Sequence, residues 1–104
     1  YRALSDGERR LLHGEIAEAL EGLHKGQTEE IAGQLARHYA EGGKEEKAVE
    51  YSLRAGDQAR VAYADQEAID HYQRALAIQK DRGAYTQAAR TLMKLGLKHL
   101  SSDN

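Results

Sequence analysis

The chain contains histidines and carboxylates that could bind a metal ion, but their spacing does not favour such a site. None of the histidines forms the His-Glu-x-x-His pair that puts two zinc ligands on one helix face. Glu67 and His71 are four residues apart and share a helix face, a spacing more typical of an exposed helix pair than of a metal site. The sequence predicts no metal and no cofactor. The histidines are His13, His24, His38, His71 and His99.

The segment Gly42-Gly43-Lys44 has the glycine and lysine content of a phosphate-binding loop but lacks the rest of its pattern. Such a loop needs a glycine five residues before the Gly-Lys pair and a serine or threonine after the lysine. His38 and Glu45 occupy those positions. The glycines therefore indicate a turn between two helices, and no nucleotide site is predicted.

Acid-base and nucleophilic catalysis have little support in the sequence. The carboxylates gather at 29–30, 45–46 and 65–67, where each group opens a predicted helix. Acidic side chains are favoured there by the helix dipole. There is no cysteine, and no Gly-x-Ser-x-Gly segment marks a nucleophilic serine. We expect the chain not to be an enzyme, and keep a metal- or small-molecule-binding helical enzyme as a remote alternative.

The composition is that of an all-α protein. The chain has 104 residues, no proline, 31% charged and 40% hydrophobic residues, and is rich in good helix formers. A net charge of −2 and short apolar runs predict neither nucleic-acid binding nor a membrane span. The absence of cysteine suits a reduced compartment, so a cytoplasmic location is expected. We expect one domain over 1–104, excised from a larger protein because the chain starts at Tyr1 without methionine.

Apolar residues at helical spacing predict five helices joined by short loops. Ser5 and Glu8 form a capping box for the first helix, and Thr28 and Asp65 are the expected caps of the second and fourth. The predicted helices cover 5–23, 28–41, 44–63, 65 to about 80, and 85–100. Five tyrosines on these stripes are expected to pack in the core or between helices: Tyr39, Tyr51, Tyr63, Tyr72 and Tyr85.

An internal repeat relates 48–55 to 68–75, since each segment begins and ends with alanine. This pattern resembles the second helix of a tetratricopeptide repeat, best at Ala68, Tyr72 and Ala75. Two other helices resemble the first helix of such a repeat. The spacing of 20 residues between Ala48 and Ala68 is shorter than the roughly 34 of that family, and its closing proline is absent, so an irregular array is expected. The matching residues are Leu35, Tyr39, Ala48, Ala55, Ala68, Tyr72, Ala75, Leu92, Leu95, Gly96 and His99.

A second resemblance involves the opening segment, with Glu8-Arg9-Arg10, Ile16-Ala17 and Leu35-Ala36-Arg37-His38-Tyr39. These residues are similar to the start of the helical sensor arm in bacterial signalling ATPases of the STAND type. Both resemblances together imply a right-handed α-solenoid of antiparallel helix pairs. They imply a scaffold or sensor that binds a protein or peptide in a concave groove.

The groove residues implied by the resemblance are exposed members of the first helices: Glu30, Arg37, Arg90, Met93, Lys94, Leu97 and Lys98. The cations among them could bind an acidic segment, and the alternative is a solvated helix surface. The fifth helix also carries a broad apolar face with no later helix to cover it. That face predicts self-association through this helix, and a dimerisation module without a peptide groove is the alternative function.

Overall fold

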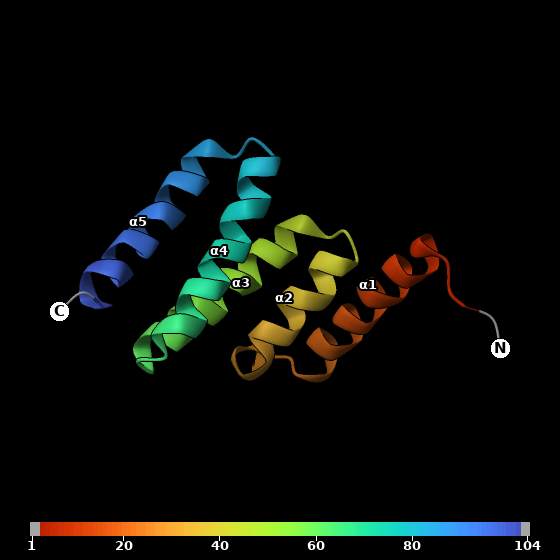
Figure 1. The fold of residues 1–104 in the computed structure, drawn as a ribbon. Coiled ribbons are helices and arrows are strands. Elements are labelled where there is room, and N and C mark those ends of the chain that lie inside the picture. The colour runs from red at the N-terminus through yellow and green to blue at the C-terminus, as the bar shows by residue number, and fades with distance from the viewer. Residues whose placement is uncertain (1–2, 103–104) are drawn as a thin grey trace.

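The computed structural model describes the backbone of residues 3–102 and the side chains of residues 3–96, and this part of the chain is all-helical. Consecutive helices pack side by side in an elongated molecule of 53 × 30 × 25 Å (Figure 1). Within 3–102 no helix is long and apolar enough to cross a membrane. The elements are α1 (Asp6–Leu23), the 3₁₀ helix η1 (Thr28–Ile31), α2 (Ala32–Glu41), α3 (Glu45–Val61), α4 (Asp65–Asp81) and α5 (Tyr85–Ser102).

The capping box at the start of α1 is confirmed. The Glu8 amide donates to Ser5 Oγ at 3.1 Å, and the Ser5 amide donates to the Glu8 carboxylate at 3.2 Å. The other two predicted caps are wrong. Thr28 lies inside η1, and Asp65 is already the first residue of α4, where an acidic residue in the first turn is still favoured by the helix dipole.

Three predicted helix ends also differ from the structure. The third helix stops at Val61 instead of residue 63, because Tyr63 takes a left-handed conformation with φ of 61° that a helix cannot contain. The fifth continues through Ser102, into the turn-forming residues at which it was expected to end. The second is a 3₁₀ helix over Thr28–Ile31 and becomes α-helical only at Ala32. The remaining predicted helix ends agree with the structure within one residue.

Three turns, those between α2 and α3, α3 and α4, and α4 and α5, have the same pattern of backbone hydrogen bonds. In each, one amide donates five residues back to the carbonyl of Tyr39, Ala59 or Gln79, at 2.8 Å in all three turns. The preceding amide donates three residues back, which completes a Schellman turn. The left-handed position of this turn is held by Gly43, Tyr63 and Gly83.

The repeat is regular at 20 residues over α3, α4 and α5, whereas α2 has only 10 residues and follows a 3₁₀ helix. Ala48, Ala68 and Ala88 occupy the same place in α3, α4 and α5, and each is at most 4% exposed. A helix of 17 residues plus a three-residue turn fills one period. The sequence shows the spacing, but its regularity appears only when the turns are compared.

Tyr63 carries backbone strain that Gly43 and Gly83 avoid. A residue with a Cβ atom in the left-handed region costs roughly 1 kcal/mol, and the Tyr63 side chain is 87% exposed, so it recovers little by packing. We therefore expect Tyr63→Gly to raise the free energy of unfolding by about 1 kcal/mol in urea denaturation. Gly83→Ala, where the added Cβ has room, should lower it by a similar amount. A stabilising Gly83→Ala would contradict this account of the turns.

The core is made of alanines and a few large side chains. One cluster joins α1, α2 and α3 around Leu35, Tyr39 and Tyr51, and a second joins α3, α4 and α5 around Tyr72 and Leu95. Tyr39, Tyr51 and Tyr72 are at most 2% exposed, as predicted. The expectation that Tyr63 and Tyr85 pack is wrong. Both lie at helix ends, beyond the packed stripes, and are 87% and 73% exposed.

Among the described side chains of α5, the packed face contains one polar residue, Thr91. Ala88, Thr91 and Leu95 are buried against the preceding helices, while Leu92 is 50% and Met93 68% exposed. Thr91 turns inward because its hydroxyl donates to the buried Gln79 of α4 at 2.7 Å. Among the repeat-signature residues on α5, Leu95 is therefore buried, whereas Leu92 and Gly96 are exposed. The side chain of His99 lies outside the described residues.

Candidate interaction surface

Helices that are two apart in the chain also contact each other. The odd-numbered helices meet on one side of the stack, and α2 and α4 meet on the other side. On one side, Glu21 of α1 reaches Lys47 of α3, and Asp57 of α3 reaches Lys94 of α5. On the other side, the His71 ring of α4 lies over Gly33 of α2, where a Cβ atom would come within 3.4 Å of it. We call these the odd-helix side and the α2–α4 side.

Glu21 ties three helices together on the odd-helix side. Its carboxylate accepts hydrogen bonds from the hydroxyls of Tyr39 on α2 and Tyr51 on α3, the second at 2.6 Å, and from Lys47 Nζ at 3.1 Å. The bond from Tyr39, followed by that from Tyr51, lowers the pKa of Glu21 to about 2. Burial and the Glu21 charge raise the pKa of Tyr51 to about 12. At neutral pH the Glu21 carboxylate is therefore ionised, and the hydroxyls of Tyr39 and Tyr51 keep their protons and donate to it.

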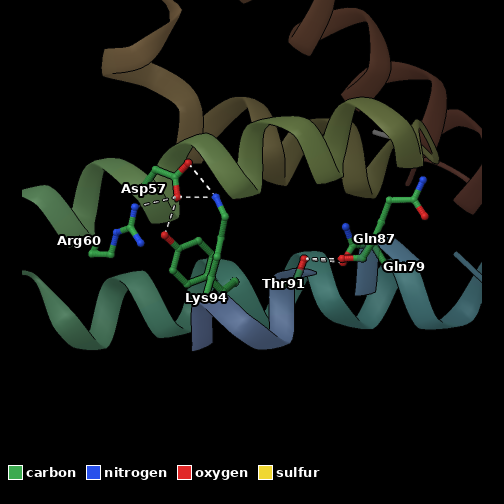
Figure 2. A network of polar contacts seen from close by, with 7 residues as sticks. Asp57, Arg60, Gln79, Gln87, Thr91 and Lys94 are labelled. Carbon is green, nitrogen blue, oxygen red and sulfur yellow. Dashed lines mark hydrogen bonds and ion pairs between the residues drawn. The ribbon is translucent and has the colours of Figure 1, made fainter. Parts of the chain in front are cut away.

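Asp57 repeats this arrangement one helix pair later. Its carboxylate accepts from the Tyr72 hydroxyl of α4 at 2.6 Å and from Lys94 Nζ of α5 at 2.9 and 3.1 Å, and Arg60 lies 4.0 Å away (Figure 2). Burial raises the pKa of Asp57, but the bonds from Lys94 and Tyr72 outweigh it and lower the pKa below its ordinary value. Each carboxylate therefore links its own helix to the next two.

Glu21 and Asp57 are suited to holding helices together and poorly suited to proton transfer. A general base works best with a pKa near the working pH, and both carboxylates are shifted in the opposite direction. Sequence reasoning missed both, because each is joined to tyrosine and lysine residues 15 to 37 positions away. Their common pattern, an acid on one helix and a tyrosine on the next, is the signal that was available.

The α2–α4 side contains an open hollow of 260 Å³ lined by charged side chains, Gln58 and small residues. The rim is formed by Glu29, Glu30, Glu67 and His71, and the floor by small residues of α3 and the following turn. Burial, followed by the charge of Arg74, lowers the pKa of His71. At neutral pH its ring is therefore an uncharged hydrogen-bonding group beside three carboxylates. The floor consists of Ala55, Ala59, Ala62 and Ala64.

The predicted groove residues lie on two different parts of the stack. Glu30 of η1 is on the rim of the hollow, and Arg37 of α2 is exposed and close enough to His71 to lower its pKa. Arg90 and Met93 are exposed on α5, and Lys94 is bound to Asp57 on the odd-helix side. The structure brings Glu30 and Arg37 to the α2–α4 side. The side chains of Leu97 and Lys98 lie outside the described residues.

Comparison with known proteins gave no relative. No protein-family model matches the chain, and no curated protein or solved structure matches it either.

Proposed function

We propose that this chain is a protein-interaction scaffold or sensor module, a tetratricopeptide-like right-handed α-solenoid of antiparallel helix pairs that binds a protein or peptide. The observation that carries the proposal is the 20-residue repetition of one helix and one Schellman turn. Repeated helices of this kind bury apolar residues mainly against their neighbours, which leaves long faces for an extended partner. On this proposal the chain is not an enzyme.

The α2–α4 side is the binding face in this proposal. Its hollow offers apolar contact with four alanines, and hydrogen-bonding and charged groups on the rim. The exposed lining of the hollow is more polar than apolar, which suits a polar side chain of a partner. Arg37 lies beside the hollow and is exposed, so it can contact a carboxylate of the same partner.

Charge reversal at Arg37 is the test of this face. Peptides selected from a random library by binding to the folded chain should bind Arg37→Glu at least about tenfold more weakly in calorimetry, because the variant replaces a cation that contacts a partner carboxylate with an anion that repels it. Lys25→Glu makes the same charge change in the exposed loop after α1 and should alter the affinity less than about twofold. Equal losses in both variants would show a non-specific charge effect and contradict the proposed face.

We extend the proposal to the setting of the chain, as the sensor arm of a bacterial cytoplasmic signalling protein of the STAND type. Its support is the resemblance of the segments containing Glu8-Arg9-Arg10 and Arg37-His38-Tyr39 to the start of such arms.

Self-association through α5 is the second candidate, and the exposure of Leu92 and Met93 favours it. Burial of two such side chains contributes about 1.5 to 3 kcal/mol each. We expect a dimer in sedimentation at tens of micromolar, and a monomer for Leu92→Glu/Met93→Glu. Leu23→Glu, which adds the same charge at an 81% exposed leucine of α1, should remain dimeric. A monomeric wild-type chain would exclude this candidate.

A further inference from the structure

The turn between α3 and α4 exposes an aromatic residue at the position where the two related turns have glycine. Tyr63 takes a φ of 61° there, and Gly43 and Gly83 hold the same position in the other turns. The Tyr63 side chain is 87% exposed, and that of Val61 is 77% exposed. A residue that strains the backbone and adds little packing within the fold is a candidate for contact with another molecule.

The α3–α4 turn borders two hollows that adjoin each other. Val61 lines an open hollow of 490 Å³. Ala62 and Ala64 line the hollow of 260 Å³ on the α2–α4 side. Glu29 and Gln58 line both hollows, which places the two next to each other. A partner segment that lies across both hollows therefore has to pass the α3–α4 turn.

The charges around the hollow on the α2–α4 side favour a basic side chain of the partner. His71 is uncharged there at neutral pH, because burial and the charge of Arg74 lower its pKa. Arg54 and Asp57, which line the larger hollow, have opposite charges and are each paired within the fold. The carboxylates of the smaller hollow are therefore the main charges that face a partner. They belong to Glu29, Glu30 and Glu67.

We propose that the α3–α4 turn holds an extended partner segment that carries a lysine or arginine, with Tyr63 as a contact residue. This inference rests on the proposed function, since it names the chemistry of the partner bound on the α2–α4 side. A cation is attracted to the face of a tyrosine ring, and the carboxylates of the hollow attract the same charge. Exposed tyrosines are frequent centres of binding energy because they bury a large area with few rotatable bonds. Tyr63 thus weakens the fold and strengthens the complex.

Opposite changes in stability and affinity in Tyr63→Gly test the inference. Peptides selected on the wild-type chain should contain lysine or arginine and bind Tyr63→Gly at least about tenfold more weakly in calorimetry. The urea midpoint of the same variant should rise, which excludes unfolding as the cause. Tyr85→Gly is the matched control. It removes a 73% exposed ring at the other end of α4 and should change the affinity less than about twofold (Figure 1).

The peptide supplies the second half of the test. Replacing its basic residue with glutamine should weaken binding to the wild-type chain at least about tenfold, and should matter less in Glu67→Gln, where one carboxylate of the hollow is gone. Tyr63→Asn keeps the test valid if Tyr63→Gly loses its fold. Asparagine also tolerates the left-handed conformation and should show the same loss of affinity.

The outcomes separate this inference from the proposed function. Unchanged affinity in the Tyr63 variants, or selected peptides without lysine and arginine, overturns the inference. If Arg37→Glu still weakens binding in that case, the proposed function stands. Weaker binding in Tyr63→Gly with unchanged affinity in Arg37→Glu supports the turn as a contact surface and contradicts the proposed binding face. The absence of any peptide that binds overturns both.

Discussion

Gly56→Ala is expected to lower the free energy of unfolding by up to about 2 kcal/mol, although alanine is the better helix former. Gly56 is buried in α3, and an added Cβ atom would lie 2.5 Å from Cε1 and 2.7 Å from Cδ1 of the Tyr72 ring. Overpacking of a filled core typically costs about 1 to 3 kcal/mol, which exceeds the roughly 1 kcal/mol that alanine gains in a helix. Movement of the ring would also weaken the bond from Tyr72 to Asp57.

Gly22→Ala is the matched control for this prediction. Gly22 is exposed near the end of α1, and its added Cβ atom has no neighbour within 4 Å. The helix preference of alanine should therefore raise stability by up to about 1 kcal/mol. Opposite signs for the two variants in thermal or urea unfolding support close α3–α4 packing at Gly56. If Gly56→Ala is also stabilising, Tyr72 does not pack on α3 as described.

Glu21→Gln is expected to remove on the order of 2 kcal/mol of stability at pH 7. The carboxylate binds Tyr39, Tyr51 and Lys47, and its pKa falls from 4.5 to about 2 in the folded chain. A shift of one unit corresponds to about 1.4 kcal/mol, and partial exposure of Glu21 reduces the full value through screening by water. Because the folded pKa is the lower one, this stability is fully present above pH 4.5. It is lost as the pH falls from 4.5 to about 2.

The pH dependence separates this effect from a general loss of packing. Urea denaturation at several pH values should show the wild-type chain and Glu21→Gln converging as the pH approaches 2. Glu18→Gln, an exposed carboxylate one turn earlier on α1, should differ little from the wild type over the same range. A constant difference between Glu21→Gln and the wild type at every pH would show that the tyrosine bonds to the charged carboxylate are not its cause.

The helices were predictable because local signals agree with the packing. These signals include the cap formed by Ser5 and Glu8, the glycines after α2, and the stripe of Leu35 and Tyr39. Each depends only on residues that are close together in the chain. The errors come from contacts between distant residues. Thr91 of α5 is buried although no apolar pattern includes it, because Gln79, twelve residues earlier, accepts its hydroxyl bond.

The possible sites were less predictable than the fold for the same reason. His13 of α1 and His38 of α2 contact each other, with their Nδ1 atoms 3.0 Å apart, although 25 residues separate them in the chain. Nothing in the spacing of either residue indicates that the two helices come this close. Glu30 and Arg37 were predicted as groove residues, and they lie on the α2–α4 side with the hollow. The hollow itself depends on Gly33 and on alanines from α3, residues that give no functional signal in a sequence.

Binding of a partner to the α2–α4 side can be followed in the amide chemical shifts of the labelled chain during titration with a selected peptide. We expect the largest changes on Glu30, Gly33, Arg37, Glu67 and His71, with small changes on α1 and on the exposed face of α5. Changes concentrated on α5 around Met93, or the absence of any selected peptide that binds, would contradict it.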